Sequence, residues 1–115
     1  MAPSEIDVER FAAWLCERED EVVGYPGTCY RSPLALWLSH ETGHVYGVDE
    51  GRYGRASQEF CFWRPLPRWA QAFAAWMDTC SVMTYALTGA EAFWMLARVE
   101  AVVQGIVLQM GRNCR

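Results

Sequence analysis

Residues 32–51, SPLALWLSHETGHVYGVDEG, carry the clearest helix start and stop signals in the chain. Ser32 is a typical helix N-cap, and Pro33 fits the first helical position, where its missing N–H costs nothing. Gly43 stands where a left-handed glycine commonly follows the last turn of a helix. These signals predict a helix over residues 33–42.

Apolar spacing predicts three more helices around this one. We expect them over about residues 5–18, 67–79 and 89–104. The acidic run at residues 17–21 is expected to close the first of them, for which Ser4 is the expected N-cap. Thr88 and Glu91 form a capping box for the last, which is apolar on nearly every face. A helix of that kind is buried or shared with a partner.

Strand signals are fewer. Residues 44–48 alternate before a turn at residues 49–51, and residues 22–27 resemble a short extended piece. Residues 51–66, rich in Gly, Arg and aromatic side chains, are predicted to be irregular. We therefore expect a mainly-α single domain over residues 1–115, a small bundle of about four helices with a possible short β-hairpin.

Composition favours a cytoplasmic protein. The chain is 52% hydrophobic with a net charge of −4, but it has no apolar run of the roughly 20 residues that span a bilayer. The N-terminus shows no basic segment followed by an apolar run, so the sequence does not predict export. Its five cysteines include no C-x-x-C pair, which predicts free thiols, most of them small core residues, in a reducing compartment. All ten basic residues are arginine, which points to a GC-rich bacterial or phage gene.

The stretch HETGH raises the possibility of a zinc-dependent hydrolase. In such enzymes two histidines one helical turn apart hold the zinc, and the glutamate between them polarises a bound water. Here Gly43 is expected to end the helix inside the motif. His44 would then lie beyond the helix and would not share a face with His40, so we predict no catalytic metal on His40, Glu41 and His44.

Two other metal arrangements are considered. The extension HETGHVYG resembles the metzincin peptidases through its two histidines, its glutamate and Gly47, and this resemblance implies a third ligand three residues later, where Glu50 stands. A structural zinc would have to use Cys29, His40, His44 and Cys61, which lack the usual paired-cysteine spacing. We predict no metal and no cofactor.

Nucleophilic catalysis is also considered. Cys29 or Cys61 with His44 and Asp49 could form a Cys-His-Asp set, but such a trio can be found in most chains of this length. The two glycine-containing loops lack phosphate-loop spacing. We predict no catalytic residue.

The segment GRYGRASQEFCFWRPLPRW, residues 51–69, is the expected recognition surface because arginine and aromatic side chains are enriched in protein interfaces. The predicted partner-binding residues are Arg52, Tyr53, Arg55, Trp63, Arg64 and Arg68. Arginines and aromatics can also stack on bases and hold phosphates, so a single-stranded nucleic-acid binder is an alternative. The acidic total argues against duplex DNA.

The expected function is that of a small non-enzymatic adaptor, inhibitor or accessory protein that binds another protein through this surface. The six tryptophans exceed what a core of this size needs, which predicts exposed rings. The apolar fourth helix and residues 106–110 predict a homodimer, with Trp94 and Leu108 in its interface.

Overall fold

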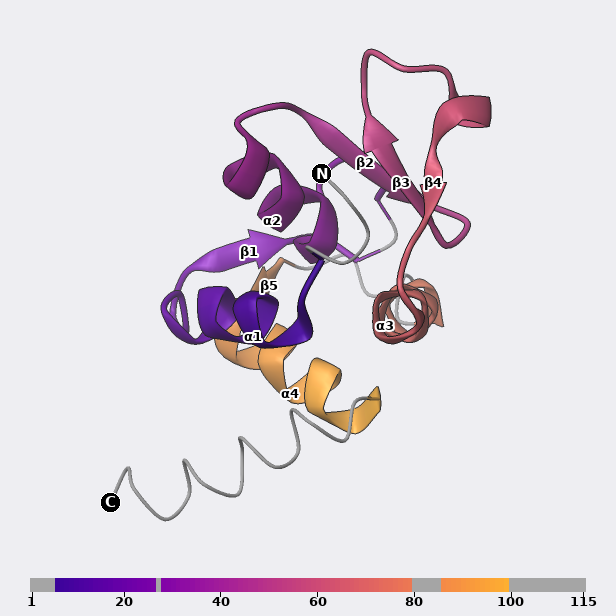
Figure 1. Ribbon diagram of the computed structural model, residues 1–115. Coiled ribbons are helices and arrows are strands. Elements are labelled where there is room, and N and C mark those ends of the chain that lie inside the picture. The colour runs from indigo at the N-terminus through magenta and orange to yellow at the C-terminus, as the bar shows by residue number, and fades with distance from the viewer. Residues whose placement is uncertain (1–5, 27, 80–85, 100–115) are drawn as a thin grey trace, which may run out of the picture.

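Four α-helices and five short strands are interspersed in the computed structural model, which describes residues 6–26, 28–79 and 86–99 (Figure 1). The helices are α1 (Val8–Cys16), α2 (Pro33–Thr42), α3 (Arg68–Thr79) and α4 (Gly89–Val99). The strands are β1 (Val22–Gly24), β2 (Tyr46–Asp49), β3 (Arg52–Arg55), β4 (Arg64–Pro65) and β5 (Leu87–Thr88). They form a two-stranded sheet, β1–β5, and a three-stranded sheet, β2–β3–β4, both antiparallel.

The expected mainly-α bundle is wrong, because this is a small mixed α/β domain. Residues 51–66, predicted to be irregular, contain β3, β4 and the 3-10 turn Phe60–Phe62. Two central turn residues with positive φ, Glu50 (50°) and Gly51 (74°), join β2 to β3. Such turns match the twist of paired strands, so they fix the hairpin although neither flanking strand has a strong apolar pattern.

The helix predictions are largely confirmed. α2 covers residues 33–42 as expected, with the Ser32 hydroxyl accepting from the Ala35 N–H at 3.3 Å and Gly43 in the left-handed region at φ 75°. α1 begins at Val8, later than expected, after Asp7 as N-cap. The proposed Ser4 cap and the continuation of the last helix over residues 100–104 lie outside the described residues.

The helices meet around a cluster of aromatic rings. Phe11 on α1 is fully buried and lies 5.1 Å from the Trp37 ring, 5.6 Å from Trp69 and 5.3 Å from Phe73. The Trp69 indole N–H donates to the Ile6 carbonyl at 3.2 Å. Burial of rings this large supplies much of the apolar driving force for folding. Trp37 and Trp69 therefore belong to the core, whereas Trp94 and Trp76 are exposed, as the number of tryptophans predicts.

The three-stranded sheet presents two different faces. Tyr46 pairs with Arg55, and Tyr53 pairs with Arg64, so these four side chains share one face. The paired glycines Gly47 and Gly54 leave the other face flat, and the Trp63 ring covers it. The Trp63 indole N–H donates to the Gln58 carbonyl at 3.2 Å, a bond within the β3–β4 connection that fixes the ring over the sheet.

The acidic run, residues 17–21, follows α1 as expected and forms a fixed turn, which we call the acidic turn. Its backbone carbonyls accept hydrogen bonds from the start of α4. The Gly89 N–H donates to the carbonyls of residues 18 and 21, at 3.1 and 3.0 Å, and the Ala90 N–H donates to that of residue 19, at 3.1 Å. These bonds satisfy N–H groups that a helix N-terminus otherwise leaves unpaired. The capping box also forms, with the Glu91 N–H 3.2 Å from the Thr88 hydroxyl.

Cysteine burial was overestimated. Cys16 and Cys29 are only partly buried and Cys61 is exposed; Cys80 and Cys114 lie outside the described residues. None of the helices within the described residues is long and apolar enough to cross a membrane.

Candidate functional site

A groove of about 770 Å³ opens beside the three-stranded sheet. Its walls come from the end of α2, from the face of the sheet that carries Tyr46 and Tyr53, and from the β3–β4 connection. The lining residues are Thr42, His44, Tyr46, Tyr53, Gly54, Arg55, Gln58, Phe62 and Arg64. A smaller hollow of about 400 Å³ adjoins it at His44 and Arg55 and includes Val45. We call the larger one the arginine groove.

The charged side chains that line the arginine groove are all positive. Arg55 and Arg64 line it, and no carboxylate is among its lining residues. Neither guanidinium forms an ion pair with any carboxylate of the described residues. Phe62 is 67% exposed beside them. The groove therefore offers two guanidinium groups that have no carboxylate partner in the described part of the chain, next to an apolar ring. This combination suits a ligand that carries both negative charge and an apolar group.

Half of the predicted recognition residues meet in this groove. Tyr53, Arg55 and Arg64 line it. Arg52 and Trp63 lie on the opposite face of the sheet, where the Arg52 guanidinium is 5.5 Å from the centre of the Phe60 ring. Trp63 is only 7% exposed, so its contribution is packing rather than contact with a partner.

One predicted residue lies outside the groove, and several groove residues were not predicted. Arg68, the remaining predicted residue, begins α3 and is not among the groove residues. Sequence reasoning missed Thr42, His44 and Tyr46 because they lie outside the arginine–aromatic segment. The signal that could have found Tyr46 is the hairpin turn, since a two-residue turn places it opposite Arg55.

The HETGH stretch lies at the edge of the groove but does not form a zincin arrangement. α2 ends at Thr42, so His40 is on the helix and His44 is beyond it, as expected. The His40 ring lies 6.1 Å from Trp14. Glu41 accepts from the Trp37 indole N–H at 3.2 Å and from the Arg10 guanidinium at 3.0 Å. The bond from Trp37 lies within α2, and the bond from Arg10 joins α2 to α1, so both carboxylate oxygens of Glu41 are used.

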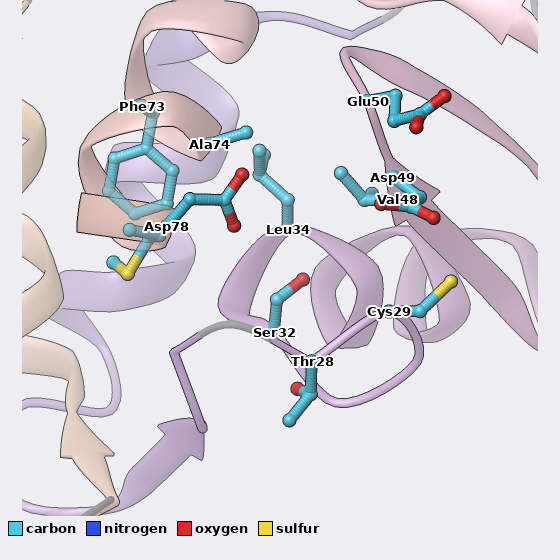
Figure 2. Close-up of a pocket in the computed structure, with 11 residues that line it drawn as sticks. Thr28, Cys29, Ser32, Leu34, Val48, Asp49, Glu50, Phe73, Ala74 and Asp78 are labelled. Carbon is cyan, nitrogen blue, oxygen red and sulfur yellow. The ribbon is translucent and has the colours of Figure 1, made fainter. Parts of the chain in front are cut away.

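A second, much smaller pocket of about 50 Å³ lies between the start of α2, the end of β2 and α3 (Figure 2). Asp49, Glu50 and Asp78 are among its lining residues. In Figure 2 the Asp78 carboxylate points toward the middle of the pocket, whereas the Glu50 carboxylate points away from Asp78. Among the residues that the structure describes, no three His, Cys, Asp or Glu side chains are grouped to hold a metal ion.

Cys29 lines the same small pocket, and its surroundings oppose nucleophilic chemistry. Burial and the nearby Asp49 carboxylate raise the pKa of the Cys29 thiol above its usual value. A catalytic cysteine needs the opposite shift, because the thiolate is the nucleophile. Cys29 lines the small pocket and His44 the arginine groove, so the Cys-His-Asp set that would use Cys29 does not share one pocket.

The fourth helix is less uniform than its sequence indicates. Phe93 and Leu96 are buried in the core, whereas Trp94 is 59% exposed. Trp94 is thus available for an interface within the described residues, and Leu108, the other expected interface residue, lies outside them. The dimer through this helix stays a prediction.

The arginine groove combines a large volume, an exposed ring and two arginines without a carboxylate partner among the residues that the structure describes, and it is the candidate functional site. Comparison of this chain with known protein families, curated proteins and solved structures finds no match.

Proposed function

We propose that this protein is a non-enzymatic binding module whose arginine groove holds an acidic segment of a partner protein. The observation that supports the proposal most directly is the pair Arg55 and Arg64, which lie in one groove without a carboxylate partner among the described residues. Unpaired arginines of this kind recognise carboxylates through two parallel hydrogen bonds.

The volume and the exposed ring favour a peptide segment over an isolated anion. A hollow of about 770 Å³ is far larger than one carboxylate needs. Phe62 supplies an apolar surface next to the charges, and aromatic side chains of this kind anchor interfaces. The preferred ligand therefore has one or two carboxylates close to an apolar side chain.

Selection from a displayed random-peptide library tests this proposal. The wild-type chain should enrich peptides in which Asp or Glu residues flank an aliphatic or aromatic residue. Exposed ion pairs contribute only about 0–1 kcal/mol each, so affinities on the order of 1–100 μM are expected, weakening as salt rises. Failure to enrich acidic peptides would contradict the proposal.

A matched pair of charge-reversal variants locates the binding site. R55E/R64E removes both groove arginines, and R52E/R68E makes the same change in charge within the same segment but outside the groove. Binding of a selected peptide should be lost in the first variant and retained in the second. Equal loss in both would mean that net charge, not the groove, attracts the peptide.

A single-stranded nucleic acid is the competing ligand, since Phe62 could stack on a base while the arginines hold phosphates. An oligothymidylate of about 20 nucleotides should bind no tighter than about 10 μM at physiological salt, the level of non-specific contact. Tighter binding that is lost in R55E/R64E would replace the protein partner with a nucleic acid.

A further inference from the structure

The acidic turn is the second strongly charged surface of the molecule. Glu17, Glu19, Asp20 and Glu21 are all exposed. Glu17 forms an ion pair with the Arg18 guanidinium at 3.5 Å, and the other three form no ion pair within the described residues. Like charges held close together without partners repel one another, so this turn is a favourable place for an outside cation to bind.

The acidic turn is also preorganised. Its backbone carbonyls are hydrogen-bonded to the first two residues of α4, and within the turn the Glu21 N–H donates to the Arg18 carbonyl at 3.0 Å. The Arg18 guanidinium additionally donates to the Trp14 carbonyl at 3.2 Å and lies 4.8 Å from the Trp14 ring. A turn fixed in this way loses little conformational freedom when it binds, which lowers the cost of association.

The two charged surfaces face different sides of the protein. Figure 1 shows the connection between α1 and β1, which is the acidic turn, on the side opposite the β3–β4 connection that borders the arginine groove. The acidic turn therefore cannot enter the groove of its own chain. Contact between the two requires a second copy.

We infer that the arginine groove of one copy binds the acidic turn of another copy, head to tail. This inference rests on the proposed function in using the same groove, and it names the chain itself as one occupant. Glu19 and Asp20 of one copy would lie against Arg55 and Arg64 of the next. Each added copy leaves one groove and one turn unoccupied, so the association continues as an open series and does not stop at a two-fold dimer.

The association is weak and depends on salt. Each contact is built from exposed charge pairs, and the net charge of −4 makes whole copies repel at long range. Self-association should be strongest at an ionic strength of about 50 mM. Salt at this level screens the long-range repulsion between copies more than it screens the close charge pairs between groove and turn.

Sedimentation velocity of the full chain is the first test. From about 10 to about 500 μM, where micromolar contacts become populated, the weight-average mass should rise steadily above the 13.1 kDa of one copy at about 50 mM salt. At about 500 mM salt it should return to one copy. A folded monomer at every concentration in low salt would overturn the inference.

Two complementary variants test the head-to-tail arrangement itself. R55E/R64E keeps the acidic turn and loses the groove, whereas E19R/D20R keeps the groove and reverses the turn. Each alone should be monomeric at low salt. Mixed in equal amounts they should form a discrete pair that cannot grow, because the intact groove of one binds the intact turn of the other. No pair in the mixture would overturn the inference.

A two-fold dimer through α4 gives a different pattern. It would stop at two copies, persist in R55E/R64E and E19R/D20R, and be lost in Trp94→Glu; that outcome would overturn the head-to-tail contact. Peptide selection on the groove is read separately. If acidic peptides bind the groove but the wild-type chain stays monomeric, only the self-association fails; if the chain assembles but selects no peptide, only the foreign partner fails.

Discussion

The α1–α4 junction and the three-stranded sheet both depend on glycines in close contact with a neighbour, but the neighbours differ. At the junction a Cβ on Gly89 would lie 2.3 Å from the carbonyl oxygens of Leu15 and Arg18. In the sheet a Cβ on Gly54 would lie 2.3 Å from the Trp63 ring. Backbone packs on backbone in the first case, and a side chain packs on backbone in the second.

Because of this difference, we expect the acidic turn and the arginine groove to tolerate substitutions at their supporting residues to different extents. The acidic turn rests on main-chain bonds that no side-chain substitution can replace. The β3–β4 connection beside the arginine groove rests on one indole ring, so a change at one position can be offset at another. We expect the junction to be the more fragile of the two and the sheet to be the more adaptable.

The largest effect is expected from Gly89→Ala. The added Cβ meets one backbone oxygen of α1 and one of the acidic turn, which cannot move without disturbing both helices. The free energy of unfolding should therefore fall by about 3 kcal/mol, at the upper end for overpacking. Urea denaturation followed by circular dichroism measures it.

Gly43→Ala is the control for this prediction. Gly43 has φ 75° but nothing within 4 Å of an added Cβ, so only the left-handed backbone is penalised, by about 1 kcal/mol. If both variants lose the same stability, the α1–α4 junction relaxes around a methyl group and the contrast with the sheet disappears.

The next effect concerns coupling between Gly54 and Trp63. Gly54→Ala should cost about 2 kcal/mol by forcing the indole away, and Trp63→Ala about 3 kcal/mol by removing a buried ring. In the double variant no ring remains for the new Cβ to meet, so the loss should be close to that of Trp63→Ala alone. The expected coupling energy is therefore about 2 kcal/mol. Additive losses would mean that the strand, not the ring contact, excludes alanine at position 54.

These contacts mark the limit of what the sequence could predict. The helix ends are local, and Ser32, Pro33 and Gly43 fixed α2 correctly because caps act within one turn. The pair β1–β5 joins Val22 to Thr88, and two-residue strands such as β5 have no local pattern to recognise. Short strands exist only through such partners, so their omission led to the wrong fold class.

The candidate site was predictable to the same extent. The arginines and aromatics in residues 51–69 pointed to the region that contains the candidate groove, and Tyr53, Arg55 and Arg64 line it. Which side of the sheet each residue faces depends on the register of β2 and β3, because a shift of one residue exchanges the faces. The register separates Arg55 from Arg52 and adds Tyr46 to the groove.

The smallest effect, a gain in stability, is expected at the β2–β3 turn that sets this register. Glu50 has φ 50°, a left-handed conformation that costs most residues about 1 kcal/mol and that asparagine adopts more readily. Glu50→Asn should therefore raise the free energy of unfolding by about 0.5 kcal/mol, whereas Gly51→Ala, at φ 74°, should lower it by about 1 kcal/mol. Thermal denaturation of both variants measures the expected gain and the expected loss of stability.

A loss of stability in Glu50→Asn would mean that the Glu50 carboxylate stabilises the small pocket between β2 and α3 by more than the strain of its backbone costs. Because Glu50 is not among the residues that line the arginine groove, peptide binding should be the same in Glu50→Asn as in the wild-type chain.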